Sequence, residues 1–142
     1  MSSTEVKAKM KIGGVVHDKT IYAGKVNGVK IYAAPQDAKQ ADGMRNLSLS
    51  FDDAADYADK LNRENYLGHS DWHVPSELEL YVLFANKNKG ALKETFNSTS
   101  LDRFYWSSTP CGDYCAFERD FGTGDQTGAD VQGSYFSVRC VR

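Results

Sequence analysis

An Asn27-Gly28 pair between two short runs of β-branched and aromatic residues constrains the fold more than any other local feature of the sequence. The run before it covers residues 20–24 and the run after it covers residues 29–33. A type I′ turn needs positive φ at both central residues, which Asn and Gly tolerate best. The sequence therefore predicts an antiparallel hairpin, with Tyr22 and Tyr32 on one face.

Two helices are expected after the hairpin, each beginning at a serine. Ser50 precedes two aspartates and an apolar stripe at helical spacing, so its hydroxyl is expected to accept a hydrogen bond from the Asp53 amide. Ser76 and Glu79 have the S-x-x-E spacing of a capping box, in which each side chain caps the backbone amide of the other. Gly90 is expected to end the second helix.

Beyond residue 100 the pattern becomes typical of strands. Residues 104–108 and 115–121 are predicted strands, and residues 135–142 are expected to close the sheet. Residues 122–128 are a predicted loop because of their glycines. The 142 residues are the length of one α+β domain. Residues 1–12 are expected to be a polar arm.

Charge and hydropathy argue against two classes of partner. The net charge of −2 comes with no cluster of Lys and Arg, whereas nucleic-acid binding needs a basic face. No window approaches the ~18 apolar residues of a membrane span, and residues 1–7 lack the apolar core of a signal peptide. We therefore expect no nucleic-acid or membrane partner, and a location in the cytoplasm or within a virion.

Three motifs, in this order, resemble the DUF1566 group, also called the Lcl C-terminal domain. They are Trp72-His73-Val74-Pro75-Ser76 with the following Glu79, then Tyr105-Trp106-Ser107-Ser108, then Val138-Arg139-Cys140-Val141-Arg142. Together they cover roughly residues 50–142. The resemblance implies a C-type-lectin-like fold. The residues themselves predict its elements here: an N-terminal β-hairpin, two helices, and a twisted antiparallel sheet with long loops. The family has Arg where this chain has His73, so an ion pair there would be weaker and pH-dependent.

The aromatic residues of these motifs are expected to be core. Trp72 and Trp106 should be buried with their indole N–H groups satisfied. The residues expected to fill the space between sheet and helices are Tyr105, Phe117, Phe121 and Phe136.

The three cysteines, Cys111, Cys115 and Cys140, leave several states open: thiols, one disulfide with one free thiol, or metal ligands. Formylglycine-generating enzymes, related in fold to the resembling family, use a cysteine pair at a copper site. That relation implies an alternative function as a metal-dependent oxidase using Cys111 and Cys115. The spacing differs by one residue, and a structural zinc site takes four ligands, so no metal or cofactor is predicted.

The histidines and acidic residues carry no metal signature. His69 and His73 are four apart, but Gly68 and Pro75 disfavour a helix between them. The triplets that bind calcium and sugar in C-type lectins are absent, which disfavours a glycan ligand. A structural ion stays open at the acidic loop residues Asp113, Asp120, Asp125 and Asp130.

The segment 109–133 is the predicted ligand-binding region. It is rich in Gly, Asp, Tyr, Thr and Gln, the composition of adaptable binding loops. The resemblance also extends to variable proteins of diversity-generating retroelements, whose variable positions lie just before the terminal strand. The candidate ligand-binding residues are Tyr114, Phe117, Glu118, Arg119, Asp125, Gln126, Asp130, Gln132 and Tyr135. An ordinary surface loop held by structural turns is the alternative.

No nucleophile elbow, P-loop or dinucleotide fingerprint occurs in the sequence. We therefore expect a non-enzymatic binding module with a protein ligand rather than a glycan. A phage or prophage particle component fits this expectation and would form homo-oligomers. The alternatives are the oxidase already described and a host-directed inhibitor protein.

Overall fold

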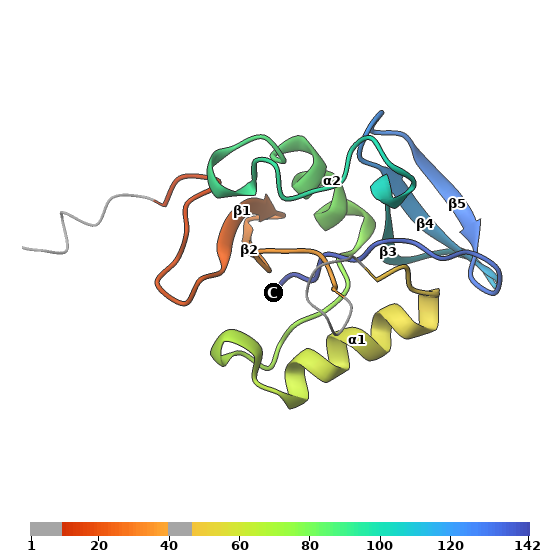
Figure 1. Cartoon of the computed structure of the whole chain (residues 1–142), viewed down its shortest axis with the longest axis horizontal. Helices are drawn as coiled ribbons and strands as arrows, with labels where there is room; N and C mark the ends of the chain where they lie inside the picture. The colour runs from red at the N-terminus through yellow and green to blue at the C-terminus, as the bar shows by residue number, and fades with distance from the viewer. Residues whose placement is uncertain (1–9, 40–46) are drawn as a thin grey trace, which may run out of the picture.

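The computed structural model describes residues 10–39 and 47–142. Figure 1 shows a two-stranded hairpin, two helices and a three-stranded sheet, with α1 (Phe51–Arg63) along one side of the molecule. This α+β layout is the one expected for a C-type-lectin-like chain, and it is confirmed. The predicted polar arm falls mostly on residues 1–9, which lie outside the described part of the chain.

The predicted hairpin is confirmed. Strands β1 (Ile21–Val26) and β2 (Val29–Ala33) pair antiparallel, and Tyr22 lies opposite Tyr32 with ring centroids 5.7 Å apart. Asn27 and Gly28 both have positive φ, of 50° and 80°. The left-handed backbone that these two residues tolerate therefore makes the turn.

Both predicted helix starts are confirmed. The Asp53 amide donates to Ser50 Oγ at 3.1 Å at the start of α1. Helix α2 (Glu77–Ala85) begins with the capping box: the Glu79 amide donates to Ser76 Oγ at 3.2 Å, and the Ser76 amide donates to Glu79 Oε1 at 2.8 Å.

The predicted end of the second helix at Gly90 is wrong, because α2 ends at Ala85. Asn86 leaves the helical conformation, and its side chain donates to Ala23 O in β1 at 2.7 Å. Gly90, at φ 51°, instead begins the short 3₁₀ turn η2 (Gly90–Leu92) and lies against Gly13, whose carbonyl oxygen a Cβ would approach to 2.5 Å.

The three-stranded sheet has the order β3 (Phe104–Gly112), β4 (Cys115–Asp120) and β5 (Gln126–Asp130), all antiparallel. The predicted loop over residues 122–128 is thus wrong from Gln126 onward. Gly128 and Asp130 are residue types that are depleted in strands, but regular pairing with β4 overrides this preference. Short 3₁₀ turns η1 (Tyr66–Gly68) and η3 (Leu101–Arg103) lie between the larger elements.

The predicted closing strand over residues 135–142 is instead a series of isolated bridges. Phe136 pairs with Leu49 next to α1, whereas Val141 pairs with both Ala33 and His73. The segment therefore crosses the molecule and joins parts that are distant in sequence. Its end lies beside β2 in Figure 1, where Arg142 and Tyr32 exchange backbone hydrogen bonds of 2.7 and 2.8 Å.

Two clusters of buried side chains form the core. One contains Trp72 and Trp106, whose indole N–H groups donate to Tyr66 O and Leu49 O at 2.9 and 2.7 Å, as predicted. The other contains Tyr105 and Phe121, with ring centroids 4.4 Å apart. Among the described residues, no helix has the length and apolar character needed to cross a bilayer.

Candidate functional site

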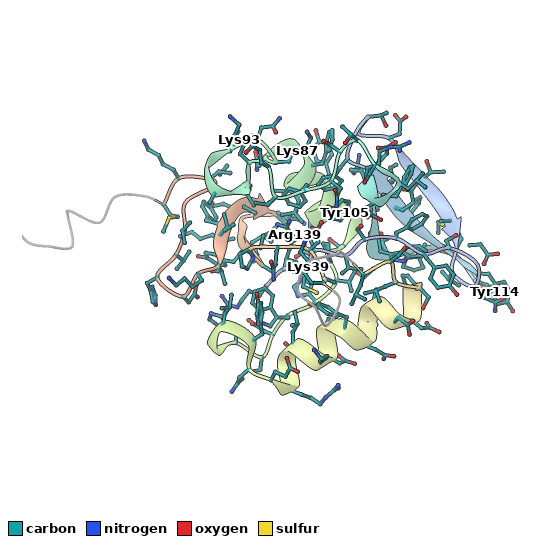
Figure 2. The ribbon with its side chains drawn as sticks, viewed as in Figure 1. Lys39, Lys87, Lys93, Tyr105, Tyr114 and Arg139 are labelled. Atoms are coloured by element: carbon teal, nitrogen blue, oxygen red, sulfur yellow. A yellow bond between two sulfur atoms is a disulfide. The ribbon has the colours of Figure 1, made fainter. Side chains whose placement is uncertain are left out.

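Part of the predicted binding region is exposed at one end of the three-stranded sheet. We call this the tip, and define it as the β3–β4 turn at residues 112–115 together with residues 130–135. Tyr114 is 68% exposed and Tyr135 is 60% exposed. The Val131 amide donates to Tyr114 O at 3.0 Å, which joins the two parts of the tip. Figure 2 shows Tyr114 at the outer end of the sheet.

A disulfide closes the base of the tip. Cys111 and Cys115 are bonded to each other across the β3–β4 hairpin, with Cα atoms 5.0 Å apart, while Cys140 is free and buried. Of the states that the sequence left open, the structure has one disulfide and one thiol. Gly128 of β5 lies directly against the bridge, because a Cβ there would come within 2.6 Å of Cys115 Sγ. The tip is thus braced by all three strands.

Asp130 fixes the second half of the tip. Its Oδ1 accepts a hydrogen bond from the Gln132 amide at 2.8 Å, and its backbone carbonyl accepts one from the Ser134 amide at 3.1 Å. Asp130 and Gln132 are both exposed. These bonds form a turn that holds Gln132 and the following Tyr135 on a defined backbone.

Three of the predicted residues lie at the opposite end of the sheet, near α2. The Arg119 guanidinium lies 5.0 Å from the ring centroid of Tyr81 and donates to Gln126 Oε1 at 3.0 Å. Gln126 in turn donates to Glu77 Oε2 at 3.0 Å. Asp125 is exposed beside them, and its carbonyl accepts from the Asp120 amide at 2.9 Å. The structure therefore does not bring Arg119, Asp125 and Gln126 together with the tip.

The remaining two predicted residues alternate along β4. Phe117 is only half-buried, whereas Glu118 is 5% exposed and lies between Trp106 of β3 and Thr127 of β5. Glu118 Oε2 has no hydrogen-bond partner. Burial raises the pKa of Glu118 to about 7, against partial lowering by a hydrogen bond from Thr127. Glu118 is therefore a buried carboxyl group beneath the sheet surface.

A pocket of about 260 Å³ between α1 and residues 72–74 was not found from the sequence. Ala54, Ala55 and Ala58 of α1 line it, opposite Trp72. The available signal was the spacing of these alanines, which places small side chains on one side of the helix. The helical spacing of these alanines predicts only that they pack in the core.

His73 lines the same pocket and makes the pH-dependent contact expected where the family has Arg. Its Nε2 lies 3.1 Å from Glu79 Oε1. The hydrogen bond to the Glu79 carboxylate raises the pKa of His73 above 6.5, against the opposing effect of burial. The other histidine of that region, His69, lies 2.6 Å from Asp18 Oδ2.

Metal-ligating side chains do not gather in the part of the chain that the structure describes. No group of three or more His, Cys, Asp or Glu side chains among those residues is placed to hold an ion. Burial raises the pKa of the remaining thiol, Cys140, to about 12, so it is a poor thiolate ligand at neutral pH.

Comparison with known proteins identifies a family. A family model described as the Lcl C-terminal domain matches residues 30–142. The match begins within the hairpin, earlier than the motifs at residues 50–142 indicated. No curated protein matches the chain.

Proposed function

The chain belongs to the Lcl C-terminal domain family, and on that basis we propose that it is a non-catalytic module that binds a protein ligand through the tip. The motif residues that define the family are mostly core residues here, including Trp72, Trp106 and Val141. A scaffold of this kind leaves its turns free to vary, and binding residues are commonly carried on turns of a rigid scaffold.

The observation that carries the proposal is the exposure of Tyr114 and Tyr135 on two turns that are braced against each other. Tyrosine supplies a large contact area at a low cost in side-chain entropy, and it is enriched at binding hot spots. The Cys111–Cys115 disulfide and the Asp130 turn hold the backbone beneath the two rings. Preorganisation of this kind lowers the entropic cost of association.

The polar groups of the tip complete the proposed contact surface. Asp130 and Gln132 offer a carboxylate and an amide next to the two tyrosines. A protein ligand is favoured over a glycan because the calcium-binding and sugar-binding triplets of C-type lectins are absent from the sequence. Beside α2, Arg119 and Gln126 are already bonded to each other, and Gln126 is bonded to Glu77 of α2. Asp125 is held in its turn by backbone hydrogen bonds to Asp120 and Thr123. We therefore give these three residues a structural role.

The proposed setting is a phage or prophage particle, in which the module would act as a receptor-binding or decoration protein, made in the cytoplasm and carried in the virion. Such a component is expected to self-associate. Size-exclusion chromatography with light scattering tests this setting: an oligomer at micromolar concentration supports it, and a monomer at every concentration counts against it.

The binding proposal is tested by affinity capture from host lysate with the intact protein and the double variant Tyr114→Ala/Tyr135→Ala. Tyr81→Ala is the matched control, because Tyr81 is a half-exposed tyrosine on α2, away from the tip. Melting curves must first show that each variant is folded. The proposal predicts a partner retained by Tyr81→Ala and lost by the double variant, whereas a partner retained by both contradicts it.

One observation favours a second candidate, a metal-dependent oxidase related to formylglycine-generating enzymes. The sulfur atoms of Cys111 and Cys115 lie next to each other, so a reduced pair would offer two adjacent thiolates. Copper(I) titration of the reduced protein tests it, with Cys111→Ser/Cys115→Ser as the comparison. Stoichiometric binding that the double variant lacks would support the oxidase, and equal binding by both proteins would contradict it. A host-directed inhibitor, the third function expected from the sequence, would be identified by the captured partner.

A further inference from the structure

The pocket between α1 and residues 72–74 has the dimensions of a site for a single side chain. Its volume is about 260 Å³, below the ~300–1,000 Å³ of sites for whole drug-sized ligands. The alanines of α1 form one wall, and Trp72 and Val74 form the facing wall. An extended aliphatic chain can therefore lie between two apolar surfaces.

The rim of the pocket carries a negative charge. Asp59 lines it, and Asp52 and Asp56 extend along the same exposed side of α1 at helical spacing. The nearest titratable group on the opposite wall is His73, whose Nε2 is directed to the Glu79 carboxylate. The pocket thus has an apolar interior and an acidic edge formed by exposed aspartates of α1.

From this arrangement we infer that the pocket binds an arginine side chain of a protein partner. The alkyl stem would lie on Ala54, Ala55 and Ala58, and the guanidinium would reach the Asp59 carboxylate. Arginine fits better than lysine because its planar head group is less strongly hydrated, stacks on aromatic rings and pairs with carboxylates through two hydrogen bonds. Trp72 and Phe51 supply aromatic rings in the pocket wall.

This site is separate from the tip. None of the residues that line the pocket lies in the segment 109–133. The inference therefore does not depend on the function proposed for the tip, and either one can fail without the other.

The test is an NMR titration of the full ¹⁵N-labelled chain with the blocked peptide acetyl-Gly-Ala-Arg-Ala-Gly-amide. A second peptide carries citrulline in place of arginine, which keeps the shape and removes the charge. The site predicts saturable shifts of the amide signals of residues 54–59 with the arginine peptide, and about three- to five-fold weaker binding of the citrulline peptide, as for a partly exposed charge pair.

Variants of α1 locate the interaction. Asp59→Asn is expected to weaken binding of the arginine peptide by about the same factor. Asp53→Asn is the matched control, because it removes the same charge from the same helix at a residue that does not line the pocket. Ala55→Leu fills the pocket from an exposed position of α1 and is expected to abolish the shifts.

Three results would overturn the inference. The first is the absence of saturable shifts in residues 54–59 at millimolar peptide. The second is equal affinity for the arginine and citrulline peptides, which would remove the role of charge. The third is an Ala55→Leu variant, shown to be folded by its amide spectrum, that binds the arginine peptide as the unmodified chain does.

Discussion

Arg139 and Tyr105 bind the same carboxylate in the centre of the molecule. Arg139 Nε donates to Asp37 Oδ1 at 2.9 Å, and the Tyr105 hydroxyl donates to Asp37 Oδ2 at 2.5 Å (Figure 2 labels both residues). Arg139 also donates to the backbone carbonyls of Ala34 and Thr95, and its guanidinium lies 4.0 Å from the ring centroid of Phe96. Tyr105 belongs to the second family motif and Arg139 to the third, so the two motifs meet at Asp37. Asp37 precedes both motifs in the sequence and lies within the matched range 30–142.

Removing the shared carboxylate is expected to destabilise the fold strongly. Asp37→Ala leaves the fully buried Arg139 without its counter-ion, which costs about 3–5 kcal/mol in comparable buried pairs. The double variant Asp37→Ala/Arg139→Met removes the orphaned charge and should lose less than the sum of the two single variants. Urea unfolding measures both quantities. Additive losses would show that the pair is not coupled.

Glu118 is expected to make the protein less stable as the pH rises. Its folded-state pKa of about 7 lies above the ordinary 4.5, so the folded state retains a proton that the unfolded state has lost. Stability should therefore fall between about pH 4.5 and 7, by at most about 3 kcal/mol, since one pKa unit corresponds to about 1.4 kcal/mol.

The variant Glu118→Gln isolates this effect because glutamine cannot ionise. Unfolding by urea at a series of pH values should show a fall for the unmodified protein that is reduced in the variant. Parallel stability curves for the two proteins across this range would mean that the Glu118 carboxyl is already ionised when folded.

The His73–Glu79 pair is expected to act in the opposite pH direction. The hydrogen bond to the Glu79 carboxylate raises the pKa of folded His73 above its ordinary value of 6.5. The stabilisation from this pair is therefore complete below pH 6.5, and it is lost as the pH rises through the pKa of folded His73. His73 is half-exposed, which limits the effect to below about 1 kcal/mol.

Replacement by the family's residue, His73→Arg, keeps the positive charge at high pH. Its melting temperature relative to the unmodified protein should rise between pH 6.5 and 9, whereas His73→Gln should show no such gain. A constant difference between the His73→Arg variant and the unmodified protein at all pH values would exclude the pair as the cause.

Gly128 is expected to be required because a larger side chain would collide with the disulfide. Its own backbone conformation does not call for glycine. A methyl group at this position would overlap Cys115 Sγ, so Gly128→Ala should cost about 1–3 kcal/mol, as overpacking does. The same substitution in a Cys111→Ala/Cys115→Ala background should cost clearly less. Thermal unfolding of the four proteins, with and without Gly128→Ala in each background, measures this difference. An equal loss of stability in both backgrounds would show that the disulfide is not what the added methyl group overlaps.

Features set by neighbouring residues could be predicted from the sequence. The Asn27-Gly28 turn and the caps at Ser50 and Ser76 depend on residues at most four apart, and each was confirmed. Strand β5 could not be predicted, because pairing with β4 holds a segment whose composition is typical of a loop. The helix end at Ala85 depends on a contact between Asn86 and β1 that is distant in sequence.

The candidate site was predicted as a region but not as an arrangement. The sequence placed the candidate residues Tyr114, Asp130, Gln132 and Tyr135 in or just after the segment 109–133, and the structure gathers them at the tip. Alternation along β4 could not show which side of the strand is buried. Phe117 is more apolar than Glu118, yet Glu118 is the buried residue and Phe117 is only half-buried. Glu118 lies opposite the fully buried Trp106 of β3 and therefore shares its face of the sheet, and this pairing between strands cannot be seen in the sequence of β4 alone.

Photo-crosslinking from position 114 shows directly whether the tip contacts a protein ligand. p-Benzoylphenylalanine is placed at Tyr114 in one sample and at Tyr81 in the other, and both are irradiated in host lysate. We expect a defined protein adduct from position 114 that position 81 does not form. The same adduct from both positions, or adducts from position 81 alone, would contradict it.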